Sequence, residues 1–257
     1  HIPWPNPESF GICPWSKELL LGMLGADIIG FHTQYHCNNF METIDRFLES
    51  RIDYERFTVN REGQITWVKP FPISIAFTES SGSSAPMAMN QRLSEKAALL
   101  KPYGLQAELI GVGVDRLDYT KGILERFRSV EYFLNKNPKY QGRFIFVQLG
   151  APSRTAIPKY QEFINEVESE VERINSQYKI KNWKAILLLK KHHSHKDIEP
   201  FYKFSDLCLV TSLHDGMNLV AKEFIASRED EKGSLILSQF TGAARELVGA
   251  LIINPYD

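Results

Sequence analysis

From about residue 105 onward, short apolar runs rich in β-branched residues alternate with longer stretches in which apolar residues recur at helical spacing. The apolar runs predict strands at 109–114, 144–149, 185–189, 207–211, 235–238 and 250–253. The stretches between them predict helices at 123–135, 158–178, 196–204 and 217–227, with a short piece at 243–248. Strands joined by helices pair in parallel, and both faces of such a sheet are covered. We therefore expect an α/β fold with a parallel sheet in this half.

The first part of the chain has a different pattern. It predicts a helix at 15–24, a strand at 27–31, a helix that continues through Glu49, and a hairpin of 57–60 with 64–68. The stretch 78–86 is rich in small and polar residues, as linkers are. We place a domain boundary there, with one domain at 1–80 and the other at 81–257.

Composition excludes several classes of protein. The chain has 257 residues, 43% hydrophobic and 24% charged, which is a globular mixture and not that of a disordered chain. Its formal net charge of -1 gives no general attraction to nucleic acid or to a membrane surface. No apolar run has the roughly 20 residues of a membrane-spanning helix. The three cysteines, odd in number and without short spacing, predict neither a disulfide framework nor a zinc site, so a cytoplasmic location is expected.

The residues that follow each strand are the candidates for chemistry, because ligands bind beyond the carboxyl ends of the strands in open parallel sheets. After the strand at 109–114, Arg116 and Lys121 stand where a helix begins. A guanidinium, an ammonium and backbone amides together suit phosphate oxygens. The alternative is a surface loop in which both cations pair with Asp115 and Asp118.

The loop after the strand at 207–211 contains Asp215 and Gly216 ahead of a predicted helix. Gly216 permits a ligand to approach the backbone closely, and Asp215 either hydrogen-bonds sugar hydroxyls or caps the helix. Glu223, two turns along, is either a ribose-binding group or a solvated residue paired with Lys222 or Arg228.

Three further features are ambiguous or negative. Arg154 is a second cation at a strand end, with an exposed turn residue as the alternative. The run 192–195 contains three histidines without a nearby acidic or cysteine ligand, so we expect no metal there. Gly111 and Gly113 do not form a dinucleotide fingerprint, because Arg116 occupies the position of its third glycine.

Six segments resemble, in collinear order over the whole length, the trehalose-6-phosphate synthase family of retaining glucosyltransferases. They include His-Ile-Pro-Trp-Pro at the start, Val-Asp-Arg-Leu-Asp-Tyr-Thr-Lys-Gly at 114–122 and Asp-Gly-Met-Asn-Leu-Val-Ala-Lys-Glu at 215–223. The others are 25–33, 151–154 and 237–244. The resemblance implies a GT-B fold of two Rossmann-like lobes. The C-terminal lobe would be nearly complete and the N-terminal lobe partial, so we expect a fragment of a longer protein.

The resemblance also implies roles for individual residues. The implied catalytic residues are His1, Arg116, Lys121 and Asp215. His1 would contact the transferred glucose, Arg116 and Lys121 the donor diphosphate, and Asp215 the glucose hydroxyls. Glu223 would bind the ribose, and Arg154 the acceptor phosphate. The remaining donor contacts would come from Gly216, Met217, Asn218, Leu219 and Val220.

The implied reaction moves glucose with retention from UDP-glucose to glucose 6-phosphate, giving trehalose 6-phosphate and UDP without a metal or other cofactor. A glucosylglycerol-phosphate synthase and a catalytically silent regulatory subunit are alternatives. One departure is His214, which occupies the position of an arginine in the family pattern. Acceptor contacts would lie largely before His1, so we expect this chain alone to bind UDP weakly without transferring glucose. Partners other than small molecules are not expected, and self-association is left open.

Overall fold

The computed structural model describes residues 3–76, 89–228, 230 and 232–257. The chain divides into two compact units, His1–Ser74 with Asp215–Met217, and Ile75–His214 with Asn218–Asp257. The expected linker at 78–86 and the boundary at 80/81 lie outside the described residues, so the proposed domain limits stay a prediction. In the described ranges, no helix is both long and apolar enough to cross a membrane.

The first unit is built on a four-stranded sheet of order β1-β4-β3-β2. β1 and β4 pair in parallel, whereas the β4–β3 and β3–β2 pairs are antiparallel. The predicted helices, first strand and hairpin are confirmed, but the short elements α1 and β2 were not predicted. The elements are α1 (Pro7–Phe10), α2 (Ser16–Met23), β1 (Ile28–Phe31), α3 (Gln34–Phe47), β2 (Arg51–Asp53), β3 (Thr58–Arg61) and β4 (Gln64–Pro70).

Trp4 fastens the start of the described chain to α3. Its indole Nε1 donates to Thr43 Oγ1 at 3.0 Å, and its carbonyl accepts from Asn39 Nδ2 at 3.1 Å. The indole ring also packs edge-on against Phe40, with 4.9 Å between ring centroids. Trp4 therefore holds the described start of the chain against α3 through both its buried side chain and its carbonyl.

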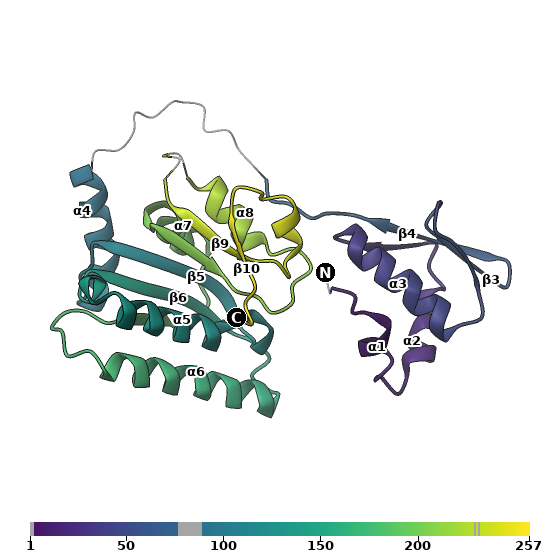
Figure 1. Cartoon of the computed structure of the whole chain (residues 1–257), viewed down its shortest axis with the longest axis horizontal. Helices are drawn as coiled ribbons and strands as arrows, with labels where there is room; N and C mark the ends of the chain where they lie inside the picture. Colours follow the sequence, from purple (N-terminus) through teal and green to yellow (C-terminus); the bar gives the residue numbers. More distant parts are fainter. Residues whose placement is uncertain (1–2, 77–88, 229, 231) are drawn as a thin grey trace. The chain divides into compact units, whose positions relative to one another are not determined.

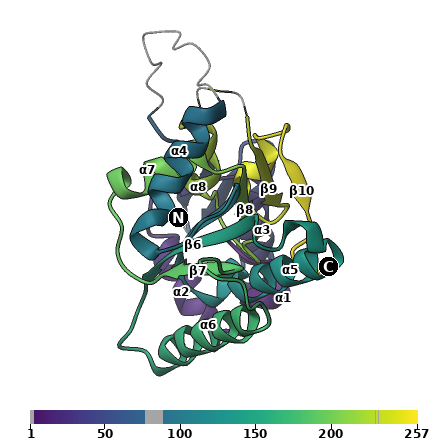
Figure 2. The same ribbon diagram turned by 90° about the vertical axis from the view of Figure 1, so that its left-hand side faces the viewer.

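The second unit contains six parallel strands in the order β10-β9-β8-β5-β6-β7. β6 and β7 follow on one side of β5, and β8, β9 and β10 follow on its other side, which is the doubly wound arrangement. Figure 1 and Figure 2 show α5 and α6 along one face of this sheet and α7 and α8 on the other. The strands are β5 (Leu109–Leu117), β6 (Phe144–Pro152), β7 (Ile186–Leu189), β8 (Leu207–Val210), β9 (Ser234–Ser238) and β10 (Leu251–Ile253).

All six predicted strands of this unit are confirmed. The prediction ended the first of them at 114, but β5 continues for three residues because its pairing with β6 extends to Leu117↔Pro152. The helix α4 was not predicted, since the same stretch lies directly after the expected linker. The helices are α4 (Met89–Leu100), α5 (Ile123–Lys136), α6 (Pro158–Ser176), α7 (His195–Phe204) and α8 (Leu219–Ala226).

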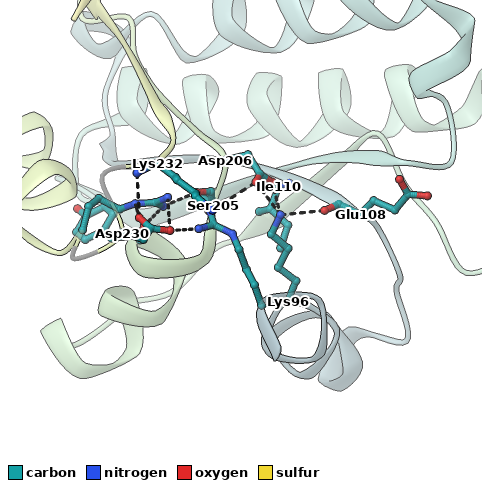
Figure 3. Close-up of polar contacts among 10 residues, drawn as sticks. Lys96, Glu108, Ile110, Ser205, Asp206, Asp230 and Lys232 are labelled. Carbon is teal, nitrogen blue, oxygen red and sulfur yellow. Dashed lines mark hydrogen bonds and ion pairs between the residues drawn. The ribbon is translucent and has the colours of Figure 1, made fainter. Parts of the chain in front are cut away.

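Ion pairs hold α4 at the amino ends of the strands. Lys96, whose side chain is 4% exposed, donates from Nζ to both carboxylate oxygens of Asp206 at 2.6 and 2.7 Å. The same ammonium donates to Glu108 O at 2.9 Å, and Asp206 also accepts from the amide of Ile110 (Figure 3). Burial lowers the pKa of Lys96, although Asp206 opposes that shift. One carboxylate therefore joins α4 to the first residues of β5 and β8.

A second acidic residue extends this cluster. Asp230 pairs with Arg92 of α4 and accepts from Arg228 Nε at 3.1 Å, and it also accepts from the amide of Lys232 at 3.1 Å (Figure 3). The polar groups at this end of the sheet are thus largely paired with one another, which suits a structural role.

Replacing Lys96 with methionine tests this anchor. Lys96→Met leaves the Asp206 carboxylate without its closest cation, so we expect the free energy of unfolding of the second unit to fall by about 3 kcal/mol. Urea denaturation measures the change, with Lys101→Met, at an exposed lysine, as the control. A loss below about 1 kcal/mol would show that water replaces the lysine at little cost.

Candidate functional site

The candidate site lies at the carboxyl ends of β5 and β8, two neighbouring strands from which the chain proceeds to opposite sides of the sheet. Such a switch point is where doubly wound sheets bind their ligands. The segments after these two strands carry most of the residues predicted from the sequence. Their local structure determines how each side chain is presented.

Arg116 is not in a loop, as the sequence predicted, but in the last part of β5, in register with Ala151 of β6. Its side chain is exposed, and Nη1 lies 3.4 Å from Ser153 Oγ. The alternative in which Arg116 pairs with Asp115 or Asp118 is wrong: within the described ranges, Arg116 forms no ion pair with a carboxylate. Its guanidinium is therefore presented to ligands at the strand end.

Asp115 and Asp118 bind other partners than Arg116. Asp115 Oδ2 accepts from Arg126 Nη1 at 2.6 Å, and both side chains are almost completely buried. Asp118 Oδ1 accepts from the amide and the hydroxyl of Thr120, which caps the 3₁₀ turn Tyr119–Lys121. Each carboxylate thus stabilises the backbone around the cations.

Lys121 lies at the end of that turn, directly before α5, as predicted. The next residue, Gly122, has φ 60° and ψ 39°, the left-handed region that favours glycine. A Cβ at this position would lie 2.3 Å from the carbonyl oxygen of Thr211. The turn that carries Lys121 therefore packs directly against the end of β8.

Arg126 was missed by the sequence analysis, although it is the largest fully buried side chain of the described chain. Besides Asp115, its guanidinium donates to Gln148 Oε1 at 2.7 Å and to Thr211 Oγ1 at 2.9 Å. A fourth hydrogen bond, from Nη2, reaches the carbonyl of Lys121 at 3.3 Å. One buried cation thus connects the ends of β5, β6 and β8 with the turn before α5.

Two glycines of β5 make room for this arrangement. A Cβ at Gly113 would lie 2.5 Å from Arg126 Nη1 and 2.6 Å from Gln148 Oε1. A Cβ at Gly111 would meet the rings of Phe144 and Phe146 at 2.9 Å. The structure thus explains both glycines by packing and not by binding of a dinucleotide.

After β8, the predicted helix begins later than expected. Asn218, with φ 74°, caps α8 by accepting from the amide of Ala221 at 3.1 Å, so the helix starts at Leu219. The capping role considered for Asp215 is therefore wrong. Gly216 and Met217 are buried and, like Asp215, belong to the first unit, whereas Leu219 and Val220 form the first turn of α8.

Glu223 points toward a cavity of about 540 Å³ that is lined by Tyr202, His195 and Leu219, among others. Its Oε2 accepts from Tyr202 Oη at 3.0 Å, and Oε1 lies 3.9 Å from His195 Nε2. Burial, and then the Glu223 carboxylate, raise the pKa of Tyr202, so that the phenol keeps its proton and donates. The alternative in which Glu223 pairs with Lys222 or Arg228 is wrong, because Lys222 pairs with Glu246 and Arg228 pairs with Asp230.

Arg154 has the exposed turn position considered as its alternative, with φ 49°. Its Nη1 donates to Tyr160 Oη at 2.7 Å, and its guanidinium lies over the ring of the same tyrosine. Tyr160 in turn contacts the ring of Tyr119, from the segment after β5. A tyrosine pair thus links Arg154 to the turn that carries Lys121.

The remaining predicted groups are placed only in part. His1 lies outside the described residues. Of the three histidines, His195 is the first residue of α7 and His192 and His193 precede it, and Ser194 and Asp197 make a reciprocal capping box at the start of the helix. Among the described residues, no cluster of three or more His, Cys, Asp or Glu side chains could hold a metal ion. The expectation that no metal is needed stays a prediction.

The second unit is a Rossmann-like lobe whose switch point carries two side-chain cations, Arg116 and Lys121. The profile of Glycosyltransferase family 20 matches residues 1–257, so the chain belongs to this family. The resemblance found in the sequence is thereby confirmed.

Curated relatives agree over the whole chain. A bifunctional trehalose-6-phosphate synthase/phosphatase of Thermoproteus tenax is 40% identical over 100% of this chain and 34% of its own length. The 56 kDa subunit of the Saccharomyces cerevisiae UDP-forming alpha,alpha-trehalose-phosphate synthase is 37% identical over 100% of this chain and 50% of its own. The chain therefore spans between about a third and a half of the lengths of these two relatives.

Solved structures share the fold. A trehalose-6-phosphate structure from E. coli, bound with UDP-2-fluoro glucose, is 34% identical with a TM-score of 0.87, over 100% of this chain and 56% of that one. A Burkholderia xenovorans UDP-forming synthase in complex with glucose-6-phosphate is 31% identical with a TM-score of 0.88, over the same shares. The predicted α/β fold of GT-B type is confirmed.

Gly113→Ala tests how closely β5 packs against the buried pair of Arg126 and Gln148. Neither Arg126 nor Gln148 can move without losing hydrogen bonds, so we expect the free energy of unfolding to fall by about 1–3 kcal/mol. The control is Gly249→Ala, at a position of the same unit where a Cβ has open space. Equal stability of the two variants, measured by thermal unfolding, would contradict this packing.

Proposed function

We propose that the protein of which this chain forms part is a retaining glucosyltransferase that moves glucose from UDP-glucose to glucose 6-phosphate. The products are trehalose 6-phosphate and UDP, and the protein acts in the cytoplasm. The observation that carries the proposal is the pair of cations, Arg116 and Lys121, at the carboxyl end of β5, beside the strand whose following helix bears Glu223. The substrates named for the related synthases and structures support the same choice.

In the proposed donor site, different residues bind the diphosphate and the ribose. Arg116 and Lys121 bind the diphosphate and balance the charge that grows on it as the glycosidic bond breaks. Glu223, held by Tyr202, accepts hydrogen bonds from ribose hydroxyls in its cavity. The backbone of Gly216, Met217, Asn218, Leu219 and Val220 lines the sugar and phosphates, and Asp215 binds glucose hydroxyls.

The proposed chemistry takes place on one face of the sugar. The bond from the anomeric carbon to the diphosphate oxygen breaks, and a bond to the acceptor hydroxyl forms on the same face. The leaving phosphate oxygen takes the proton of that hydroxyl, so Asp215 need not act as a nucleophile. His1 positions the transferred glucose, and Arg154 binds the acceptor phosphate. Side-chain cations supply the positive charge, so no metal is required.

An acceptor panel tests this proposal. The full-length protein is assayed for UDP release from UDP-glucose, with glucose 6-phosphate, glycerol 3-phosphate or no acceptor, in the presence of a metal chelator. We expect release only with glucose 6-phosphate. Release with glycerol 3-phosphate would favour a glucosylglycerol-phosphate synthase, and binding of UDP without release would favour a regulatory subunit.

Arg116→Ala in the full-length protein should lower turnover by about two orders of magnitude while thermal unfolding stays unchanged. The guanidinium is exposed, so its loss leaves no buried charge, but the leaving diphosphate loses a charge-assisted contact of roughly 3 kcal/mol. Arg143→Ala, at an exposed arginine paired with Glu108, is the control. Near-normal turnover of Arg116→Ala would overturn the assignment of the donor site.

A further inference from the structure

We infer that Arg126 is a positioning residue for the donor diphosphate, acting through Thr211 on the turn that presents Lys121. The inference rests on the proposed function for its ligand. Arg126 itself is 0% exposed, so it touches no substrate. Its effect must therefore pass through the groups that it binds.

The path from Arg126 to Lys121 is short. Arg126 Nε donates to Thr211 Oγ1 at 2.9 Å, and the Thr211 hydroxyl donates to Gly122 O at 2.9 Å. Arg126 Nη2 also lies 3.3 Å from Lys121 O. The carbonyl groups of Lys121 and Gly122 are thus both held by one buried guanidinium, the first directly and the second through the Thr211 hydroxyl.

A further hydrogen bond ties the same turn to the loop after β8. The amide of Leu213 donates to Thr120 O at 2.8 Å. Thr211 and Leu213 are separated by one residue, so the turn is bound at two nearby points of this loop. Gly122 also packs closely against Thr211, because a Cβ there would lie 2.3 Å from the Thr211 carbonyl oxygen. The Cα position of Lys121 is therefore fixed relative to the end of β8.

This matters for binding because Lys121 acts as a point charge on a flexible stem. If its backbone were free to move, the ammonium would lose conformational freedom on binding a diphosphate, and that entropic cost would lower the affinity. Arg126 removes that freedom in advance. The fork of the guanidinium is needed for this, since it bonds Asp115 and Gln148 on one side and Thr211 and Lys121 O on the other.

Matched conservative variants of the full-length protein test the inference. Arg126→Lys keeps a buried cation for Asp115 but cannot also reach Thr211 and Lys121 O. Thr211→Val removes the hydroxyl at constant shape, whereas Thr211→Ser keeps it. We expect Arg126→Lys and Thr211→Val each to weaken UDP binding, measured by calorimetry, by about tenfold. Thr211→Ser and the control Arg128→Lys, on the exposed face of α5, should bind like wild type.

The decisive measurement combines Arg126→Lys with Lys121→Ala. If Arg126 acts through Lys121, the first substitution should change UDP affinity by less than about twofold when Lys121 is already absent. Equal effects in both backgrounds, or no effect of Arg126→Lys alone, would overturn the inference. A purely structural role would lower the thermal stability of both backgrounds and give additive losses of affinity.

A readout without ligand separates this inference from the proposed function. Hydrogen exchange of peptides covering 118–126 should be faster in Arg126→Lys and Thr211→Val than in Thr211→Ser. Unchanged exchange in all variants would overturn the inference. Failure of the wild-type protein to bind UDP would instead overturn the proposed function, and the exchange result would still decide the role of Arg126.

Discussion

The buried charge of Arg126 is the constraint around which the carboxyl end of the six-stranded sheet is built. A guanidinium without solvent must be paired and hydrogen-bonded, and its acceptors are Asp115 of β5, Gln148 of β6 and Thr211, the residue directly after β8. This pairing has a consequence for the surface. Because Asp115 pairs with the buried Arg126, it does not pair with its neighbour Arg116, whose exposed guanidinium remains without a carboxylate partner among the described residues.

The two ends of the same sheet differ in how their charges are used. At the amino ends, Asp206 is bonded by Lys96 of α4 and by the amide of Ile110, so that end is an internally satisfied joint (Figure 3). At the carboxyl ends, the buried network around Arg126 includes Asp115, and the next residue, Arg116, is exposed. The exposed charge of Arg116 thus stands at the switch point of the strand order, where doubly wound sheets bind their ligands.

The sequence predicted the strands of the second unit because a sheet covered on both faces leaves continuous apolar runs. It did not predict α4, whose contacts with Asp206 join residues far apart in the chain, nor the cap at Asn218, since a left-handed asparagine has no periodic signal.

Arg126 did have a signal in the sequence: it stands three residues after Ile123 and four before Val130, both buried. A cation on the apolar face of a helix, opposite an alternation of glycines in a strand, indicates a buried guanidinium. Arg116 and Lys121 could be predicted as site residues because cations that follow an apolar run are visible in the sequence, whereas the geometry that holds the backbone of Lys121 comes from residues of β5, β6 and the end of β8.

The glycines of β5 distinguish this sheet from those of dinucleotide-binding folds. In dinucleotide-binding folds of the same strand order, a glycine-rich turn lets backbone amides approach the pyrophosphate. Here Gly111 and Gly113 lie inside the strand, and the space beside them is filled by Phe146 and by Arg126. In the proposed donor site, the diphosphate is met instead by the side-chain cations Arg116 and Lys121. Such cations stabilise charge that develops on an oxygen as its bond breaks, which a cofactor whose diphosphate stays intact does not require. The packing of the two glycines thus removes the backbone approach that a dinucleotide uses and is compatible with the proposed group transfer.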